Sequence, residues 1–475
     1  MKNLINKVID STPGKVTLGL IGINLLLGIY DIVKISIYLS TPITILITIV
    51  LLAILMLLIL CASKYKKISI ALNVLLTIIL IIGCIALNKT SEFTSTITDT
   101  KEYETVEIMV LKESELYEDS DLNGLVMGAS LDDSLGLERA REILEEHNKD
   151  GVRERLYDDM MEAYNDLVDG KIDMIVITTQ TISFLEDDLG DVYEYLRSIF
   201  TKSYEITTDV VTEDIDILTE PFTVYLCGTD ISGKTIGTAS RSDANMLLTV
   251  NPNTKQVSLQ IIPRDLYAYV ESKDASTKLS WSGRYGGVTS SMKAIEHELG
   301  IDINYYAKIN WYGLSDLVDA LGGIDAYSHY DYSLNGFHYV KGMNHLNGNQ
   351  ALLMCTERKS LPNNELSRGL QQMEVLKGII NKVIQEPSFD NLMAVLNTIE
   401  NNFMTNYPEE KFIDAFNLMV SMRAQLGDID SYTMQGEYKW HYDEIKKGYY
   451  AYYYYPTEAE KEKVRDRIND VLLGR

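Results

Sequence analysis

The stretch RSDANMLLTVNPNTKQVSLQIIPRD, residues 241–265, contains two apolar runs separated by a polar link. The runs, 245–250 and 256–263, have the branched and apolar residues that strands favour, and the NPNTK link between them is rich in turn-forming residues. The pattern therefore predicts a β-hairpin. Charged residues stand at the outer ends of the hairpin, namely Arg241, Asp243, Arg264 and Asp265.

The hairpin belongs to a region in which strand and helix patterns alternate. An apolar strand at 222–228 precedes it and runs into the sequence Gly-Thr-Asp. Helical periodicity follows at 291–300, 309–323 and 366–385. We therefore expect residues 220–475, including the C-terminal tail, to form an α/β sandwich with a central mixed sheet.

Arginines and aspartates collect at the ends of these elements. The arginines stand in four separate clusters, at Arg241, Arg264, Arg358 and Arg368. The planar fork of arginine matches phosphate oxygens, and carboxylates suit hard cations. Asp230 and Asp243 could return to one sheet edge as ligands for Mg²⁺, and the alternative is a pair of loop aspartates that cap turns. For Arg264 beside Asp265, a structural ion pair is the alternative to a phosphate contact.

A loop and a helix start lie between the last two arginines. The sequence LPNNEL (361–366) leads into a helix that carries Gln371 and Gln372 on its first turns. A helix N-terminus adds backbone N–H donors for an anion, although a network of salt bridges at the helix start is the alternative. Because four arginines recur at element ends, we favour a site for a metal ion and a polyphosphate.

Three apolar runs near the N-terminus predict membrane spans, at 16–39, 43–62 and 68–87. Lysines precede the first run, and SKYKK (63–67) separates the second from the third. Basic residues favour the cytoplasmic side, so residues 1–88 are expected to form a cytoplasmic N-terminus and three spans, with everything after about residue 88 outside the cytoplasm. A cleavable signal peptide does not fit three such runs in series.

Between the spans and the sandwich we expect a second, smaller domain. The polar, Thr-rich residues 89–104 are typical of a linker. Residues 105–219 then alternate between strand and helix patterns, which predicts an α/β accessory domain. Its strands are expected at 105–111, 124–130 and 171–177, and its helices at 135–147 and 152–168. The segments DLNG (121–124) and DGKIDMIV (169–176) resemble one lobe of periplasmic solute-binding proteins. That resemblance implies ligand sensing, and the alternative is a spacer or docking domain.

Charge and motif content exclude several classes of function. The formal net charge of −25 opposes a nucleic-acid partner. No GxSxG, P-loop or HExxH pattern occurs. The four cysteines are too few to indicate a disulfide scaffold, and we expect them to be buried apolar residues. The tyrosine-rich tail GYYAYYYYPTEAE (448–460) predicts an edge strand packed on the domain, with sugar binding by stacking as the alternative.

Several motifs, in order, resemble the catalytic domain of the LytR–CpsA–Psr family over residues 220–385. The matching pieces are GTD (228–230), RSDANMLLTVNPNTKQVSLQIIPRD (241–265), TKLSWSGRYGG (277–287), LVDALGGID (317–325), HYVKGMNHLNGNQALLM (338–354) and ERKSLPNNELSRGLQQ (357–372). Three spans and an accessory domain further resemble the CpsA-type members tied to capsule assembly.

The resemblance implies a membrane-anchored enzyme that transfers a glycopolymer, capsular or teichoic-acid-like, from undecaprenyl pyrophosphate to peptidoglycan by Mg²⁺-assisted phosphoryl transfer. The family's metal-binding aspartates correspond to Asp230 and Asp243. Its pyrophosphate-binding residues correspond to Arg241, Arg264, Arg358, Arg368 and Gln372, and among them we expect Arg241 and Arg264 to act with Asp243 in catalysis. The polyprenyl tail of the membrane lipid is expected in an apolar tunnel beside the sheet. Thr356 stands where many members carry the first arginine of an RxR pair.

Two other functions fit the same residues. One is a non-catalytic protein that binds polyprenyl phosphate as a sensor or cell-wall regulator. The other is a hydrolase that cleaves pyrophosphate without an acceptor. Both would use the same cluster of arginines to bind the lipid, but the sensor would leave the lipid intact and the hydrolase would cleave it.

Overall fold

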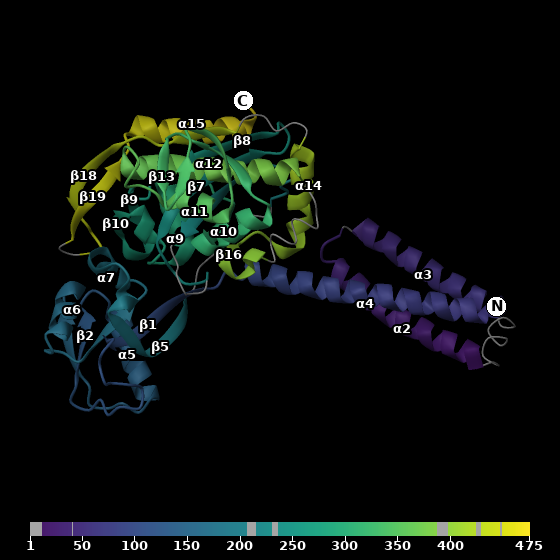
Figure 1. Ribbon diagram of the computed structural model, residues 1–475, viewed down its shortest axis with the longest axis horizontal. Coiled ribbons are helices and arrows are strands. Elements are labelled where there is room, and N and C mark those ends of the chain that lie inside the picture. Colours follow the sequence, from purple (N-terminus) through teal and green to yellow (C-terminus); the bar gives the residue numbers. More distant parts are fainter. Residues whose placement is uncertain are drawn as a thin grey trace.

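A computed structural model describes residues 12–39, 41–206, 215–229, 236–386, 398–423, 429–446 and 449–475. The chain forms a bundle of long helices and two α/β domains, and the bundle projects from one side of the larger domain (Figure 1). The smaller domain comes first in the sequence, and the larger one carries the C-terminus. This mixed α/β architecture with apolar N-terminal helices is the predicted fold class.

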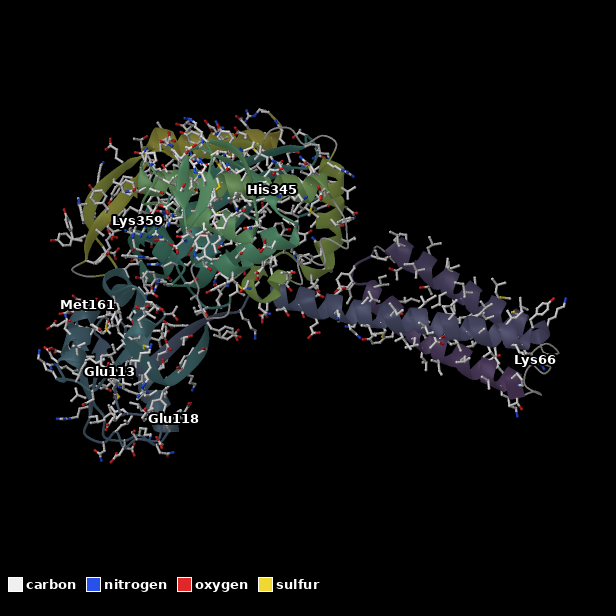
Figure 2. All side chains as sticks on the ribbon, viewed as in Figure 1. Lys66, Glu113, Glu118, Met161, His345 and Lys359 are labelled. Carbon is white, nitrogen blue, oxygen red and sulfur yellow. The ribbon has the colours of Figure 1, made fainter. Side chains whose placement is uncertain are left out.

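Three helices of the bundle are long and apolar enough to cross a membrane: α2 (Thr12–Ile35), α3 (Thr41–Lys64) and α4 (Lys66–Ile97). Their apolar side chains point outward, as Leu26 and Leu57 do. Lys66, which begins α4, lies at the end of the bundle that is remote from both α/β domains (Figure 2). The link between the second and third helices is therefore on the side away from the domains.

The expected linker at 89–104 is for the most part helical. Helix α4 continues to Ile97, and β1 (Glu102–Leu111) begins after only residues 98–101. The threonines of this stretch satisfy their hydroxyls inside the helix, since Thr94 Oγ1 donates to the carbonyl oxygen of Thr90 at 2.9 Å. Thr94 Oγ1 also lies 2.5 Å from a carboxylate oxygen of Glu409 in the larger domain, so this polar stretch is part of a helix that contacts the larger domain.

The smaller domain is a five-stranded mixed sheet in the order β3-β2-β4-β1-β5. Strands β2 and β3 are parallel, β2 and β4 are parallel, and β1 is antiparallel to both β4 and β5. The helices pack against this sheet to form two apolar clusters. The remaining elements are β2 (Val126–Ser130), α5 (Ser134–Glu146), β3 (Arg153–Tyr157), α6 (Met160–Val168), β4 (Met174–Thr178), α7 (Ile182–Leu189), a 3₁₀ turn (Val192–Glu194) and β5 (Leu196–Ile206).

The predicted helix at 152–168 is wrong in its first part. Residues 153–157 form β3, which pairs with β2, and the helix α6 starts only at Met160. Asp159 caps this helix by accepting the N–H of Met161 at 2.9 Å. Strand pairing and the cap together override the helical periodicity. Strand β5, which sequence patterns did not indicate, pairs along the whole length of β1.

The larger domain has a six-stranded mixed sheet in the order β16-β11-β6-β7-β8-β17. The predicted hairpin is confirmed, because β7 and β8 pair in antiparallel fashion. Strands β6 and β11 are parallel, as are β8 and β17. The strands are β6 (Phe222–Thr229), β7 (Ser242–Asn251), β8 (Gln256–Ile261), β11 (Tyr305–Asn310), β16 (Phe403–Thr405) and β17 (Asp430–Thr433).

Helices cover both faces of this sheet, which gives the expected α/β sandwich. On one face, α9 (Gly287–Leu299) and α15 (Glu458–Leu473) pack on side chains such as Leu247. On the other, α12 (Asn364–Gln385) and α14 (Phe412–Met422) pack on Met246 and its neighbours. Period-two alternation along β7 thus supplies both cores.

Smaller elements complete the larger domain. Helix α10 (Trp311–Ala320) begins after Asn310, which caps it by accepting the N–H of Gly313 at 2.9 Å, so the expected helix at 309–323 is shorter at both ends. The other elements are β9 (Tyr267–Val270), β10 (Ala275–Lys278), α8 (Leu279–Ser282), β12 (Ile324–Ser328), β13 (Tyr332–Leu334), β14 (Phe337–Tyr339), β15 (Gly342–Leu346), α11 (Gly348–Thr356), β18 (Glu437–Tyr442) and β19 (Tyr450–Tyr455), with 3₁₀ turns at Glu271–Lys273, Glu400–Asn402 and Glu409–Lys411.

Candidate active site

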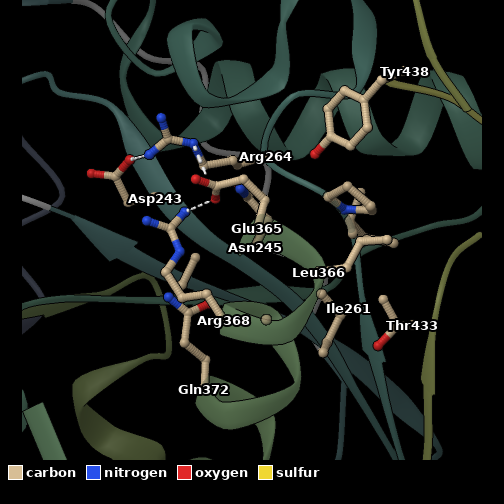
Figure 3. A pocket seen from close by; sticks show the side chains of 14 residues that line it. Asp243, Asn245, Ile261, Arg264, Glu365, Leu366, Arg368, Gln372, Thr433 and Tyr438 are labelled. Carbon is tan, nitrogen blue, oxygen red and sulfur yellow. Dashed lines mark hydrogen bonds and ion pairs between the residues drawn. The ribbon is translucent and has the colours of Figure 1, made fainter. Parts of the chain in front are cut away.

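Three of the predicted charged residues, Asp243, Arg264 and Arg368, line one pocket of the larger domain (Figure 3). Asp243 comes from the start of β7, Arg264 follows the end of β8, and Arg368 projects from the first turns of α12. Tyr438 of β18 closes the opposite side of the pocket, and Gln372 lies at its floor. Charged residues at the ends of elements that are far apart in the sequence thus lie together in one pocket.

Asp243 is the buried anion of the pocket and forms an ion pair with Arg264. Burial alone would raise the pKa of this carboxyl group. The positive charges of Arg264, Arg241, Arg368 and Arg284 outweigh burial, so the pKa lies below its usual value. Asp243 therefore stays ionised at neutral pH.

Glu365, which sequence reasoning did not single out, is the second anion of the pocket. Its Oε1 accepts from Arg358 Nη1 at 2.9 Å, and its Oε2 lies 2.5 Å from Arg368 Nη2 and 4.0 Å from Arg264 Nε. Three of the predicted arginines thus converge on one carboxylate. Its spacing of three residues from Arg368 on one helix face was the available signal.

The other predicted residues occupy the edges of this arrangement. Arg241 immediately precedes β7, and its charge lowers the pKa of both Asp243 and the buried Arg284. The side chain of Arg358 is 47% exposed, which places it at the rim. Gln372 is buried and donates to the carbonyl oxygen of Cys355 at 3.1 Å, so it also fastens α12 to α11. Thr356, the last residue of α11, is exposed.

The two expected metal ligands have different outcomes. Asp230 lies outside the described residues, whereas Asp243 lies in the pocket beside its arginines. Within the described ranges, no group of three or more acidic, histidine or cysteine side chains could hold a metal ion. The hydroxyl of Thr229, just before Asp230, is buried and finds no hydrogen-bond partner among the described residues, and Thr229 pairs with Ser242 on the neighbouring strand. An ionised Asp243 and an oxygen of this kind fit a hard cation.

An apolar groove opens from the floor of the charged pocket. Ala244 and Gln372 line both the pocket and a groove of about 760 Å³, whose other walls include Leu226, Met246 and Trp311. A second apolar groove continues between the sheet and α12 and α14, and it shares Ala307 and Ile379 with the first. The charged pocket and the apolar groove are therefore adjacent, which suits an amphiphilic ligand with a charged head and an apolar tail.

Comparison with known proteins places this architecture in a family. The model of the LytR_cpsA_psr family matches residues 193–470, more than half of the chain. The chain belongs to the LytR_cpsA_psr family. The match covers the whole six-stranded sheet and the segments that carry Arg264 and Arg368.

Relatives of known name are similar over about half of this chain. A protein of Bacillus anthracis named polyisoprenyl-teichoic acid–peptidoglycan teichoic acid transferase TagU is 31% identical over 253 residues, which is 53% of this chain and 80% of that protein. The protein of the same name from Enterococcus faecalis is 32% identical over 217 residues, 46% of this chain and 71% of that protein. The crystal structure of B. subtilis TagU is 28% identical and covers 54% of this chain and 97% of its own, with a TM-score of 0.43.

In this LytR_cpsA_psr protein the two α/β domains are joined by a buried ion pair. Lys308 of β11 lies 2.6 Å from Glu102 at the start of β1, and both side chains are at most 2% exposed. Lys308 also donates to the carbonyl oxygen of Thr238 at 3.0 Å, and Glu102 accepts the backbone N–H of Val288 at 2.5 Å. A side chain at Gly287, which has a φ of +69°, would collide with Glu102. Both charged groups of this ion pair therefore have a further hydrogen bond to the backbone.

Arg284 forms a second link between the domains and was missed as a site residue, although it lies within the motif at 277–287. Its guanidinium is buried and donates to the carbonyl oxygen of Thr179 at 3.0 Å and to Glu186 at 2.9 Å, both in the smaller domain. Burial lowers its pKa from the usual value of arginine. Because its charge also lowers the pKa of Asp243, the smaller domain helps to position one of the cations that act on this carboxyl group.

Proposed function

We propose that this protein is a membrane-anchored enzyme that transfers a capsular or teichoic-acid-like glycopolymer from undecaprenyl pyrophosphate to peptidoglycan. The names of the relatives support a glycopolymer transfer to peptidoglycan. The observation that carries the proposal is the junction at Gln372, where a pocket rich in arginine opens into an apolar groove. A polyprenyl pyrophosphate has the matching charged head and apolar tail.

The arginines would hold the pyrophosphate head. Arg264 and Arg368 face the pocket from two elements, and Arg358 stands at its rim. Their charge-assisted hydrogen bonds neutralise phosphate oxygens and fix the position of the phosphorus. Because the carboxylate of Glu365 contacts Arg358 and Arg368, phosphate oxygens would have to take its place, and Glu365 would turn aside.

The transfer replaces one bond to phosphorus by another. The hydroxyl oxygen of the acceptor sugar attacks the glycan-bearing phosphorus, the bond from that phosphorus to the bridging oxygen breaks, and polyprenyl phosphate leaves with that oxygen. The hydroxyl proton passes to a base. The low pKa of Asp243 suits a carboxylate that stays ionised beside the phosphates. Asp243 together with Asp230 would hold Mg²⁺, which would supply further neutralisation of the phosphate charge.

The apolar groove would hold the start of the polyprenyl tail. Its walls between the sheet and α12 are almost entirely aliphatic or aromatic, and the second groove extends them towards α14. Burial of apolar surface would stabilise the bound lipid in proportion to the area removed from water. The carrier would thus be recognised by its head and its tail together.

One reconstitution separates this proposal from its alternatives. Purified full-length protein in detergent would receive a lipid-linked glycopolymer donor, with and without peptidoglycan. Covalent attachment of the polymer to peptidoglycan is the expected result. Release of the polymer at the same rate without acceptor would show a hydrolase, and tight donor binding without turnover would show a sensor; either result would overturn the proposal.

The proposed orientation has the N-terminus in the cytoplasm. Lys66 and the start of α2 both lie at the end of the helical bundle remote from the α/β domains (Figures 1 and 2). We expect reporter fusions after Lys67 to give a cytoplasmic signal and fusions after Lys89 an extracytoplasmic one. A cytoplasmic signal at Lys89 would rule out any action on the cell wall.

A further inference from the structure

The C-terminal hairpin presents aromatic rings on one of its two faces. Tyr438, Trp440 and Tyr442 of β18 share this face with the cross-strand partners Tyr454, Tyr452 and Tyr450 of β19. We call these six residues the aromatic ladder. Consecutive rings are in contact: Trp440 stacks on Tyr450 with a centroid distance of 5.3 Å and an interplanar angle of 18°, and Tyr438 stacks on Tyr452 at 5.7 Å and 23°.

The outer part of the ladder is open to solvent. The exposed fractions are 55% for Trp440, 63% for Tyr442, 52% for Tyr450 and 44% for Tyr452. Tyr454 of the ladder and Tyr453 of the opposite face are both fully buried, and Tyr453 contacts Tyr267 edge-on at 5.3 Å. The predicted edge strand accounts for these buried rings and leaves the four exposed rings of the ladder unexplained.

The inner end of the ladder belongs to the candidate active site. Tyr438 lines the charged pocket, and its hydroxyl group lies 3.5 Å from Oδ2 of Asp265, the residue next to Arg264. Figure 3 shows the Tyr438 hydroxyl directed into the pocket from the side opposite Gln372. The exposed rings thus continue, contact by contact, from the wall of the pocket to the molecular surface.

We propose that the aromatic ladder binds an uncharged glycan strand, the sugar backbone of the acceptor, and guides its hydroxyl group into the pocket. This inference rests on the proposed transferase function. The face of an aromatic ring carries partial negative charge and attracts the C–H groups on the flat side of a sugar ring. The tyrosine hydroxyls at the ring edges can exchange hydrogen bonds with sugar hydroxyls. No charged side chain belongs to the ladder, so its chemistry matches a neutral, flat and repetitive ligand.

The position of the ladder favours the acceptor over the donor. In phosphoryl transfer the attacking and leaving oxygens lie roughly in line on opposite sides of the phosphorus. The leaving polyprenyl phosphate would extend into the apolar groove, which opens at Gln372. The attacking hydroxyl must then arrive from the other side, and Tyr438 stands there.

A membrane is a poor occupant for the same face. Exposed tyrosine and tryptophan side chains also suit the lipid–water interface. In Figure 1, however, β18 and β19 lie at the end of the long axis opposite the membrane-spanning helices. The ladder therefore faces the region outside the membrane, where an acceptor polysaccharide would lie.

The test uses full-length protein in detergent and chitin oligosaccharides as uncharged N-acetylhexosamine probes. Binding would be followed by calorimetry, and the fluorescence of exposed Trp440 would report stacking directly. The variants are Trp440→Ala, Tyr450→Ala and Tyr452→Ala, with Trp440→Phe as the conservative change. Tyr312→Ala is the matched control, because Tyr312 is exposed to 57% and lies on α10, outside the ladder.

We expect each alanine variant to weaken oligosaccharide binding roughly tenfold, in line with the loss of one aromatic contact. Trp440→Phe should retain part of the affinity, and Tyr312→Ala all of it. In the transfer assay the KM for the acceptor should rise while the KM for the lipid-linked donor stays the same. Without sugar, the unfolding midpoint of these variants should fall only slightly, because the substituted rings are exposed and lose only their cross-strand contacts.

Three results would overturn the inference. The first is a wild-type protein that does not bind the oligosaccharide, and the second is a set of ladder variants that raise the donor KM alone. The third is ladder-dependent binding to phospholipid vesicles that contain no sugar. Because the titration needs no turnover, ladder-dependent sugar binding in a protein without transfer activity would overturn the transferase proposal and leave the glycan-binding face in place.

Discussion

Two groups of buried charges in this protein have opposite balance. At the domain junction, Lys308 and Glu102 form a pair that is almost fully enclosed, and both partners have further hydrogen bonds. Around the candidate active site, Arg241, Arg264, Arg358 and Arg368 outnumber the two carboxylates that line the pocket, Asp243 and Glu365. The first group is matched one to one, whereas the second has more arginines than lining carboxylates among the residues that the structure describes.

The difference indicates what each group is for. A buried pair with matched charge and satisfied hydrogen bonds needs nothing from outside, so its role is to hold the two domains together. An excess of buried positive charge costs free energy in the empty protein, as the lowered pKa of Arg368, caused by burial and by Arg264, shows. Binding of an anionic ligand to these arginines would offset that cost. The predictions below test the contrast, from the largest expected effect to the smallest.

Asp243→Asn should have the largest effect, on activity. The change removes the ionised group that faces the phosphates and the proposed metal, so we expect transfer to fall by at least about a hundredfold. An excess of chelator should give the same loss in the wild-type protein, and added Mg²⁺ should reverse it. Transfer rates measured with the lipid-linked donor decide the point. Transfer that continues in excess chelator would exclude the role of Mg²⁺.

Lys308→Met should have the largest effect on stability. The variant leaves Glu102 buried without its partner, which costs about 3–5 kcal/mol in comparable pairs. The midpoint of unfolding by denaturant, monitored by the fluorescence of buried Trp281, should fall. The double variant Glu102→Gln with Lys308→Met should recover part of the loss, because no unpaired charge remains. Equal midpoints for the wild type and Lys308→Met would show that the junction does not depend on this pair.

Arg368→Ala should behave in the opposite way. The arginine provides charge-assisted hydrogen bonds to phosphate worth roughly 1.5–3 kcal/mol, so binding of a polyprenyl pyrophosphate should weaken about tenfold or more. Without ligand, the unfolding midpoint should stay the same or rise, because one of several mutually repelling cations is gone. A lower midpoint with unchanged ligand affinity would show that the cluster is a structural salt-bridge network.

Thr356→Arg should have the smallest effect of these changes. It tests the contrast between the two charge groups by adding a cation near the pocket instead of removing one. Thr356 ends α11 two residues before Arg358, is exposed, and bonds only to carbonyl oxygens of its own helix in the described contacts. An arginine here would add a charge near the rim, and we expect pyrophosphate binding to tighten a few-fold. Affinity measured by calorimetry checks this, with Thr356→Gln as the uncharged control. An equal gain in both variants would show that charge is not the cause.

Local patterns in the sequence predicted the parts of this protein that depend on local chemistry. The three apolar helices and the hairpin of residues 241–265 follow from apolar periodicity and turn residues, and the structure has them. Arg264, Arg368 and Asp243 were expected at one site, and they lie in one pocket. Long helices and hairpins contain most of their own stabilising contacts, so a short stretch of sequence is sufficient to indicate them.

What the sequence did not indicate depends on partners that are distant along the chain. Lys308 and Glu102 are separated by 206 positions, and Arg284 finds Thr179 across 105. Residues 153–157 form a strand because β2 offers an edge to pair with, which their own helical periodicity cannot show. Glu365 stood in a loop between two arginines, and only the folded structure turns its carboxylate towards both.

The unbroken helix α4 sets the height at which this enzyme works. Its 32 residues would extend about 48 Å, of which a bilayer's hydrocarbon core takes roughly 30 Å. The part of α4 beyond the hydrocarbon core connects the membrane to the catalytic domain without a break, and Thr94 near its end contacts Glu409 of that domain. A flexible linker would allow the domain to vary its distance from the membrane, whereas a continuous helix fixes that distance. The proposed lipid carrier would then have to leave the bilayer in part, and the apolar groove would cover the first carbons of its tail.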